Sequence, residues 1–262
     1  MADQIYKYPR TRHIEGSGLQ LGDEDLDVVP FERLVGCRLV VEEKMDGANC
    51  AISFSESRKL LLQSRGHYLG GGPRERQFDL FKTWAHRYAA ELWNILEARY
   101  LLFGEWLYAK HTIFYTELPH YFLEFDIYDR RDDVFLSTER RAKMLEPASF
   151  VSSVKVLYAG LVPSASALVA LVGPSHFIEP GHMRRLEALC LERGLDPAQA
   201  QRETDSSGLM EGLYIKVEED GTVKERYKYI RAGFLQTVFD SQNHWMDRPL
   251  LPNRLRSGSS LF

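Results

Sequence analysis

Two strand-like segments near the end of the chain, joined by a short turn, set the strongest limit on its fold. Residues 213–217 and 222–229 carry many β-branched and aromatic side chains, and Asp220-Gly221 stands between them. An Asp-Gly pair in this position is typical of a tight β-hairpin, because these two residues adopt positive φ angles at low cost. The sequence therefore predicts two adjacent antiparallel strands in this part of the chain.

Shorter apolar segments and helical patterns fill the rest of the chain. Strands are expected at residues 39–41, 51–54, 60–62, 100–106, 121–128 and 154–158. Helices are expected at residues 74–99, between Ser137 and Pro147, at 164–171 and at 182–193, where Gly194 ends the last one. The first stretch of about 30 residues is polar and rich in turn-forming types, so it is expected to run over the surface. Together these segments predict an α+β fold of mixed or antiparallel sheets with flanking helices.

Length and composition narrow the class of protein. The chain has 262 residues, of which 44% are hydrophobic and 27% charged, as in an ordinary globular protein with one large domain. No apolar run is long enough to span a bilayer, so no membrane association is expected. Cys37, Cys50 and Cys190 lie too far apart to suggest a disulfide framework or a zinc cluster, which favours a cytoplasmic location. The net charge of -4 still allows a local basic groove for nucleic acid.

A lysine at the end of an apolar strand is the sharpest chemical signal. Glu43-Lys44-Met45-Asp46-Gly47 directly follows the predicted strand at residues 39–41. A lysine amine is a good nucleophile only when it is neutral, and burial or nearby cations lower its pKa toward that state. An ordinary surface lysine in a turn would give the same short pattern, so the other motifs in the chain must decide between the two interpretations.

Lys44 opens an ordered series of six motifs. The series reads Lys44-Met45-Asp46-Gly47, Gln63-Ser64-Arg65-Gly66, Phe103-Gly104-Glu105-Trp106, Glu124-Phe125-Asp126-Ile127-Tyr128, Glu211-Gly212-Leu213-Tyr214-Ile215-Lys216 and Arg226-Tyr227-Lys228. It resembles motifs I, Ia, III, IIIa, IV and V of the covalent nucleotidyltransferase superfamily, which comprises ATP-dependent DNA and RNA ligases and mRNA capping enzymes. The resemblance covers most of the chain. No Gly-x-x-x-x-Gly-Lys-Ser/Thr loop is present, so the chemistry of P-loop proteins is excluded.

The resemblance implies a role for one residue of each motif. Lys44 becomes covalently joined to the nucleotide, and Arg65 contacts phosphate. Glu105 contacts the ribose, and Phe125 stacks on the purine. Glu211 is linked to a metal ion. These residue types suit such roles, because carboxylates accept hydroxyl hydrogen bonds or hold Mg²⁺, and an aromatic ring offers a face to a base.

Cationic residues complete the expected site. The resemblance implies that Lys216 points toward phosphate and that Arg226 and Lys228 form a phosphate-binding pair. Arg226 stands where the family often has lysine, and the two side chains differ in geometry, so Lys228 is the stronger candidate. With Arg65, these cations are expected to bind the triphosphate and also to lower the pKa of Lys44. The full set of expected nucleotide-binding residues is Glu43, Asp46, Gly47, Asn49, Arg65, Glu105, Phe125, Lys216, Arg226 and Lys228, with Glu211 and Glu105 as metal ligands.

The segment after the last motif favours the RNA ligase branch of the superfamily. About 34 residues follow Lys228, too few for the five-stranded oligonucleotide-binding (OB) barrel of DNA ligases and capping enzymes. The expected organisation is thus a single ATP-grasp-like nucleotidyltransferase domain over residues 1–262, with an N-terminal arm at 1–35 and no C-terminal OB domain. Asn49, two residues after Gly47, and the helical stretch before Glu211 also look like the RNA ligase branch.

The implied reaction has three steps. Lys44 takes AMP from ATP with Mg²⁺ or Mn²⁺, AMP passes to an RNA 5′-phosphate, and a 3′-OH then displaces AMP. A separate end-healing kinase or phosphatase is a possible partner. The alternatives are a minimal ATP-dependent DNA ligase, a guanylyltransferase that uses GTP, and a catalytically inactive nucleotide-binding or RNA-binding module. The presence of Lys44, Glu105, Glu211 and Lys228 together argues against the inactive module.

Overall fold

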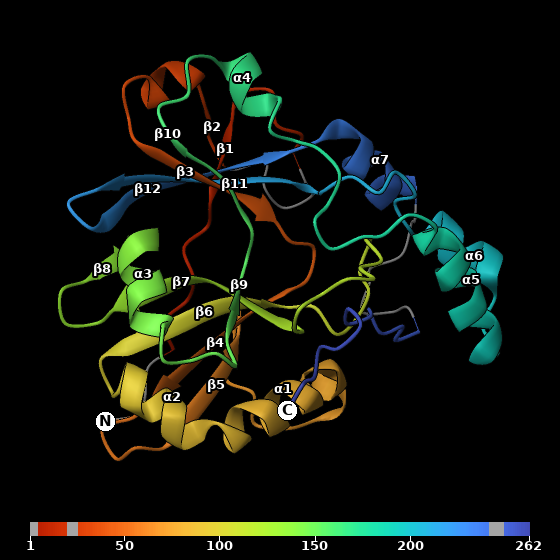
Figure 1. Ribbon diagram of the computed structural model, residues 1–262, viewed down its shortest axis with the longest axis horizontal. Helices are drawn as coiled ribbons and strands as arrows, with labels where there is room; N and C mark the ends of the chain where they lie inside the picture. Colours follow the sequence, from red (N-terminus) through yellow and green to blue (C-terminus); the bar gives the residue numbers. More distant parts are fainter. Residues whose placement is uncertain (1–4, 20–25, 241–248) are drawn as a thin grey trace.

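The computed structural model describes residues 5–19, 26–240 and 249–262. It confirms the α+β fold: helices flank strands that are mostly antiparallel to their neighbours. The strands lie in two groups, one above the other in Figure 1. The upper group consists of β3 (Leu39–Lys44), β10 (Val156–Gly160), β11 (Gly212–Glu219) and β12 (Thr222–Ile230). The lower group consists of β4 (Ala48–Phe54), β5 (Leu60–Ser64), β6 (Tyr100–Trp106), β7 (Phe122–Asp129) and β8 (Val134–Leu136).

One continuous sheet connects the two groups, in the order β10-β3-β11-β12-β8-β7-β6-β4-β5. The predicted hairpin is present as β11 and β12, and Asp220 and Gly221 in its turn have φ angles of 50° and 71°. At the end of this hairpin, Val223 pairs with Phe135 of β8. The two groups therefore converge at the joint between β8 and β12, and their inner faces enclose a space that widens away from this joint.

Part of the N-terminal arm belongs to the sheet, so the prediction that the arm runs over the surface is wrong for that part, although Lys7, Pro9 and Arg10 are exposed. β1 (Arg12–Ile14) pairs in parallel with β12 and with β2 (Val28–Val29), and η1 (Phe31–Leu34) follows. Tyr8 and Ile14 are buried, because they cover apolar side chains of both groups. His13 is also buried and bonds to Ser17, so it anchors the arm. The arm's residues 1–4 and 20–25 lie outside the described part.

The single helix predicted at residues 74–99 is divided into three pieces. They are η2 (Pro73–Phe78), α1 (Asp79–Arg87) and α2 (Ala89–Leu96). Tyr88 stands between α1 and α2 with φ −101° and ψ 20°, and its ring stacks on Phe150 with centroids 4.2 Å apart. Helical periodicity continues across the break, because Trp84 and Leu92 on either side of it pack into the same core beneath β4, β6 and β7.

The remaining helices lie close to the predictions. Ser137 caps α3 (Thr138–Leu145) by accepting a hydrogen bond from the amide of Arg140, as its position indicated. α4 (Ala165–Val169) and α5 (His182–Glu192) match their predicted segments, whereas α6 (Pro197–Arg202) and α7 (Ala232–Asp240) were not predicted. The strand expected at 154–158 is displaced, because β9 (Ser152–Ser153) pairs with β7 before β10 begins. Among the described residues, no helix has the length and apolar character needed to cross a bilayer.

Candidate active site

A cleft opens where the inner faces of the two strand groups diverge. It contains about 790 Å³ of space that no atom fills, part of which is open to solvent. Its walls come from β3, β11 and β12 on one side, from β4, β6 and β7 on the other, and from the N-terminal arm. The lining residues are Tyr8, Pro9, Thr11, Glu42, Glu43, Lys44, Met45, Asn49, Arg65, Glu105, Phe125, Val154, Tyr214 and Lys228.

Lys44 lies in this cleft, paired with a buried carboxylate. Strand pairing sets Lys44 opposite Gly212, next to Glu211, and the Lys44 Nζ atom lies 2.7 Å and 2.8 Å from the two carboxylate oxygens of Glu211. Gly47 brings the turn after Lys44 against β6, because a Cβ at Gly47 would lie 2.8 Å from the carbonyl oxygen of Trp106. The chain thus turns close to Glu105, which faces Asn49 across the β4–β6 pair.

Three carboxylates act on the charge of Lys44. Burial by itself lowers the pKa of Lys44, but Glu211, Glu105 and Asp46 together favour the cation, and the net pKa is raised. The prediction that nearby cations lower this pKa is therefore wrong for the ligand-free protein. Lys44 is protonated here, and it must lose a proton before it can act as a nucleophile.

The two glutamates beside Lys44 have displaced pKa values. Burial raises the pKa of Glu105 to about 8, against the lowering effect of Lys44. Burial likewise raises the pKa of Glu211 to about 7, although Lys44 lowers it. Both carboxyl groups therefore lose their protons near neutral pH. The carboxylates that result have the negatively charged oxygens that a divalent cation prefers as ligands. No ready-made cluster of three or more acidic, histidine or cysteine ligands occurs in the described ranges.

These pKa values predict how the stability of the metal-free protein depends on pH. From about pH 5 to 7 the folded chain keeps protons on Glu105 and Glu211 that the unfolded chain has lost, and from about pH 7 to 8 it keeps mainly the proton on Glu105, so stability must fall as the pH rises. Each proton contributes a slope of about 1.4 kcal/mol per pH unit. Denaturant unfolding at several pH values should show this fall, and Glu105→Gln should reduce its slope. An unchanged slope in that variant would contradict a raised pKa for Glu105.

Besides Glu43 and Glu105, four predicted nucleotide-binding residues line the same cleft. Asn49, Arg65, Phe125 and Lys228 all line it, and they come from four different segments of the chain. The ring of Phe125 is partly exposed and meets the ring of Tyr8 edge-on, with centroids 5.3 Å apart. The structure thus brings together an aromatic face, cationic side chains and Lys44 around one space.

Lys216 and Arg226 do not line the cleft, which corrects two predictions. Lys216 is fully buried, and its Nζ atom lies 2.9 Å from Glu42 and 3.0 Å from Asp126. The Nε atom of Arg226 lies 3.2 Å from Asp126, and its guanidinium lies 3.6 Å from the ring centre of Phe135. Both side chains are engaged within the protein rather than directed at a phosphate in the cleft.

Position along the strands explains this difference. Tyr214 pairs with Lys228, and two residues further along Lys216 pairs with Arg226, on the same face of the hairpin. The first pair lies where the cleft is open, and the second lies closer to the joint between β8 and β12. A buried cluster of charges fills that narrow end, with Arg141 bonding to Glu42 at 2.6 Å.

The side chains of Glu43 and Asp46 are held by neighbouring loops. Glu43 lies in the cleft wall, but its carboxylate accepts hydrogen bonds from Ser175 at 2.6 Å and from the amide of His176 at 3.1 Å. One oxygen of Asp46 accepts hydrogen bonds from the amides of Thr112 and Ile113, both at 2.7 Å. In this structure the two carboxylates fasten loops beside Lys44, so direct nucleotide binding by them is not supported.

The sequence alone did not identify the N-terminal part of the wall. Tyr8, Pro9 and Thr11 line the cleft, and the Tyr8 hydroxyl bonds to Asp126 and to the hydroxyl of Tyr214. Burial raises the pKa of Tyr8 well above its usual value, so this hydroxyl stays protonated. The alternation of Tyr6 and Tyr8 in a polar segment was the available signal, because such spacing is typical of a strand with one buried face.

Comparison with known proteins decides the family. The family model described as RNA ligase matches residues 38–230, well over half of the chain. This chain belongs to the RNA ligase family. The matched region begins just before β3 and ends with β12, so it contains Lys44, Glu105, Glu211 and Lys228. No curated protein sequence matches the chain significantly.

Solved structures support the fold of this RNA ligase family member. A lysine mutant of Naegleria gruberi RNA ligase, solved with ATP and Mn, has a TM-score of 0.52 and 20% identity. A glutamate mutant of the same enzyme, solved with AMP and Mn, has a TM-score of 0.53 and 20% identity. In both comparisons 80% of this chain is covered, but only 54% of the other chain. The chain therefore spans about half the length of these ligases.

Proposed function

We propose that this protein is an ATP-dependent RNA ligase that joins RNA 3′-OH and 5′-phosphate ends, with Lys44 as the residue that carries AMP. One observation carries the proposal: the Lys44 amine lies in the cleft against Glu211, and Glu105, Arg65, Phe125 and Lys228 line the same space. Membership of the RNA ligase family supports the reaction class. The described residues fit a single nucleotidyltransferase domain that includes the N-terminal arm.

The first step follows from the surroundings of Lys44. Its neutral Nζ atom attacks the α-phosphorus of ATP, a nitrogen–phosphorus bond forms, and the bond to pyrophosphate breaks. The Lys44 ammonium first transfers a proton to the Glu211 carboxylate, with which it is in hydrogen-bonding contact, and the second proton that the nitrogen loses once the nitrogen–phosphorus bond has formed passes to the departing pyrophosphate. Arg65 and Lys228 neutralise phosphate charge from the cleft wall, and Phe125 offers its ring to the base.

A divalent cation fits the same cleft. Glu105 and Glu211 would hold Mg²⁺ or Mn²⁺, because both are carboxylates that become charged near neutral pH and Mg²⁺ often takes only one or two protein carboxylates besides water and phosphate. When bound, such an ion neutralises charge on the triphosphate. The Naegleria gruberi RNA ligase structures solved with ATP or AMP and Mn support this choice.

The remaining steps would act on RNA. AMP passes from Lys44 to the 5′-phosphate of an RNA end, and the 3′-OH of a second end then attacks that phosphate and releases AMP. Ends that lack a 5′-phosphate or a 3′-OH would need a separate kinase or phosphatase. Binding to the RNA backbone would weaken as salt increases, because counterion release contributes to the affinity.

Labelled nucleotides test the proposal. The purified protein is incubated with Mg²⁺ and either ATP or GTP labelled on the α-phosphate, denatured and examined for covalent label. Acid-labile label from ATP alone is expected. Label from GTP would indicate capping-type chemistry, and no label in folded, AMP-free protein would contradict the proposed mechanism. A second assay on nicked duplexes separates RNA ligase from DNA ligase, since a DNA ligase would seal all-DNA nicks.

A further inference from the structure

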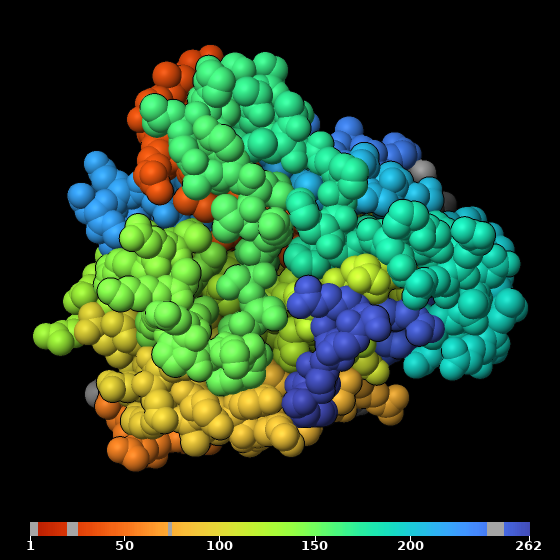
Figure 2. Space-filling model, in the orientation of Figure 1, coloured from red at the N-terminus to blue at the C-terminus, as the bar shows by residue number. Residues whose placement is uncertain are grey.

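The last described segment of the chain crosses over the loop that follows β6. Residues 249–261, here called the C-terminal strap, lie along residues 107–121, here called the β6–β7 loop. The amide of Arg254 donates to the carbonyl oxygen of Tyr115 at 2.9 Å, and the amide of Arg256 donates to that of Leu118 at 2.9 Å. Figure 2 shows the strap on the surface, beside this loop and the segment of α5 and α6. The strap lies outside the region matched by the family model.

Asn253 is the centre of this contact. Its side chain is 1% exposed and makes two hydrogen bonds to the β6–β7 loop. Its Oδ1 atom accepts from the amide of Tyr115 at 2.9 Å, and its Nδ2 atom donates to the carbonyl oxygen of Leu107 at 2.7 Å. Its backbone bonds to Tyr108 at 2.8 Å and to the hydroxyl of Tyr121 at 2.9 Å. One buried residue thus fixes the loop at four points.

The same loop holds the turn that follows Lys44. The amides of Thr112 and Ile113 donate to the Asp46 carboxylate at 2.7 Å each. The hydroxyl of Tyr115 accepts a hydrogen bond from the Asp46 amide at 2.8 Å. Tyr115 is fully buried and connects the two contacts. Its amide donates a hydrogen bond to Asn253, and its hydroxyl accepts one from the amide of Asp46. Asp46 is two residues from Lys44, so this loop constrains the path of the chain directly after Lys44, where β3 ends.

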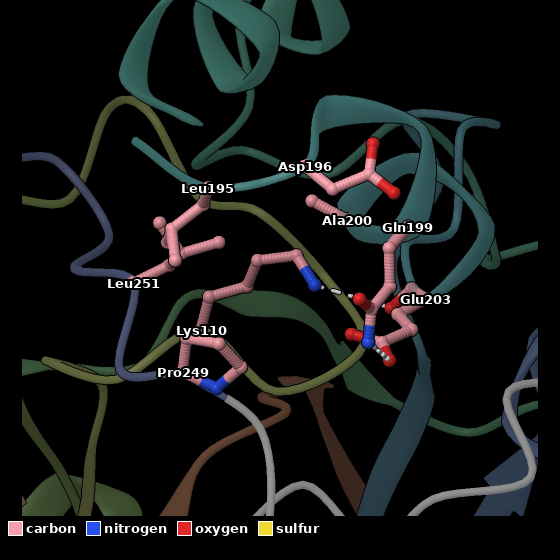
Figure 3. Close-up of a pocket in the computed structure, with 8 residues that line it drawn as sticks. All are labelled: Lys110, Leu195, Asp196, Gln199, Ala200, Glu203, Pro249 and Leu251. Carbon is pink, nitrogen blue, oxygen red and sulfur yellow. Dashed lines mark hydrogen bonds between the residues drawn. The ribbon is translucent and has the colours of Figure 1, made fainter. Parts of the chain in front are cut away.

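A buried lysine secures the far side of the loop. The Nζ atom of Lys110 donates to the carbonyl oxygens of His111 at 3.0 Å and of Glu203 at 3.1 Å. Figure 3 shows Lys110 between the α6 residues and the strap residues Pro249 and Leu251. The amide of Lys110 also donates to the carbonyl oxygen of Leu251 at 2.7 Å. The small hollow in Figure 3 is therefore the junction where strap, loop and α6 meet.

We propose that Asn253 is a positioning residue for the attack of Lys44 on ATP: it fixes the β6–β7 loop, which fixes Asp46 and so aims the Lys44 amine. This inference rests on the proposed function of Lys44. The hydrogen bonds of the Asn253 side chain go to Tyr115 and Leu107, neither of which lines the cleft, so its loss removes no direct hydrogen bond to a cleft-lining residue. A displacement of about 1 Å at a reacting group can cost about a hundredfold in rate, because reactivity depends on alignment.

Single-turnover formation of lysyl-AMP tests the inference in the full chain. Asn253→Ala is expected to lower the rate at saturating ATP at least about tenfold, while the ATP concentration for half-maximal rate changes less than about twofold. Tyr115→Phe removes only the hydroxyl that accepts from Asp46, and it should lower the same rate without changing the strap. Leu186→Ala is the stability-matched control, because it opens a cavity in the apolar cluster of α5 and α6 without changing a residue of the strap or the β6–β7 loop.

A conservative variant adds a readout that a purely structural role would not give. Asn253→Asp can replace both hydrogen bonds only while its carboxyl is protonated, when it donates to Leu107 and accepts from Tyr115. Its rate relative to the unaltered protein should therefore fall as the pH rises, and thermal unfolding at each pH shows that the protein remains folded.

Three outcomes would overturn the inference. They are an unchanged rate in folded Asn253→Ala, an equal loss of rate in Leu186→Ala, and a loss confined to ATP affinity. A failure of the proposed function is distinguishable from all three, because the unaltered protein would then form no lysyl-AMP at all. Arg254→Ala, an exposed change in the same strap, should keep the normal rate.

Discussion

Replacing Lys44 with alanine is expected to abolish covalent labelling by ATP, with a fall of at least about a thousandfold. The Lys44 amine is in hydrogen-bonding contact with Glu211, so this substitution removes the amine that the proposed reaction uses. The measurement is label retained on denatured protein after incubation with ATP labelled on the α-phosphate. Lys224→Ala, which removes an exposed lysine from the same strand group, is the matched control and should label normally.

The same variant should still fold. Loss of the Lys44 amine leaves Glu211 and Glu105 without the cation between them. Both carboxyl groups already have raised pKa values, so they can take up protons near neutral pH. Thermal unfolding at pH 6 should therefore show a cooperative transition. Normal labelling of a folded Lys44→Ala protein would show that another residue is the nucleophile and would refute the proposed mechanism.

Replacing Lys216 with alanine is expected to lower the free energy of unfolding by about 3 kcal/mol, because it removes the cation that buried Glu42 and Asp126 share and leaves each carboxylate with one arginine partner. Denaturant unfolding measures this change directly. Lys216→Met retains most of the side-chain volume and should be destabilised to a similar degree, which separates loss of charge from loss of packing. Lys224→Ala should change stability by less than about 1 kcal/mol.

This experiment also decides between the two assignments of Lys216. If Lys216 bound phosphate, as the motif suggests, Lys216→Ala would keep its stability and lose affinity for ATP. If Lys216 instead neutralises the buried carboxylates at the narrow end of the cleft, as its burial indicates, Lys216→Ala would lower the free energy of unfolding. A variant with unchanged stability and weaker ATP binding would contradict the structural assignment.

Local patterns in the sequence were sufficient to predict much of the fold. The Asp220-Gly221 hairpin and the Ser137 cap depend on short-range chemistry, and both occur where predicted. The break at Tyr88 was not predictable, because the periodicity of apolar residues passes through it and the stacking partner Phe150 is distant in sequence. The burial of Tyr8 likewise depends on Asp126 and Tyr214, with which no local pattern connects it.

Some residues of the candidate site were likewise predictable from the sequence, and others depend on tertiary structure. Motif spacing indicated Lys44, Asn49, Arg65, Phe125 and Lys228, all of which line the cleft. Lys216 and Lys228 looked equivalent in sequence, because both are strand lysines on one face of a hairpin. Their surroundings differ because the two strand groups converge toward the joint between β8 and β12, and this convergence is a tertiary feature.

The pairing of the N-terminal arm with β12 has a consequence for the folding of this chain. Tyr8 bonds to Tyr214, 206 residues later, and β1 pairs with a strand that is completed only at Ile230. Contacts of such long sequence separation form late, because a large loop must close before they contribute stability. During synthesis the arm cannot form these contacts until the residues up to Ile230 have left the ribosome. The wall of the cleft that contains Tyr8 should therefore be the last to assemble, and a nascent chain should gain nucleotide affinity only then.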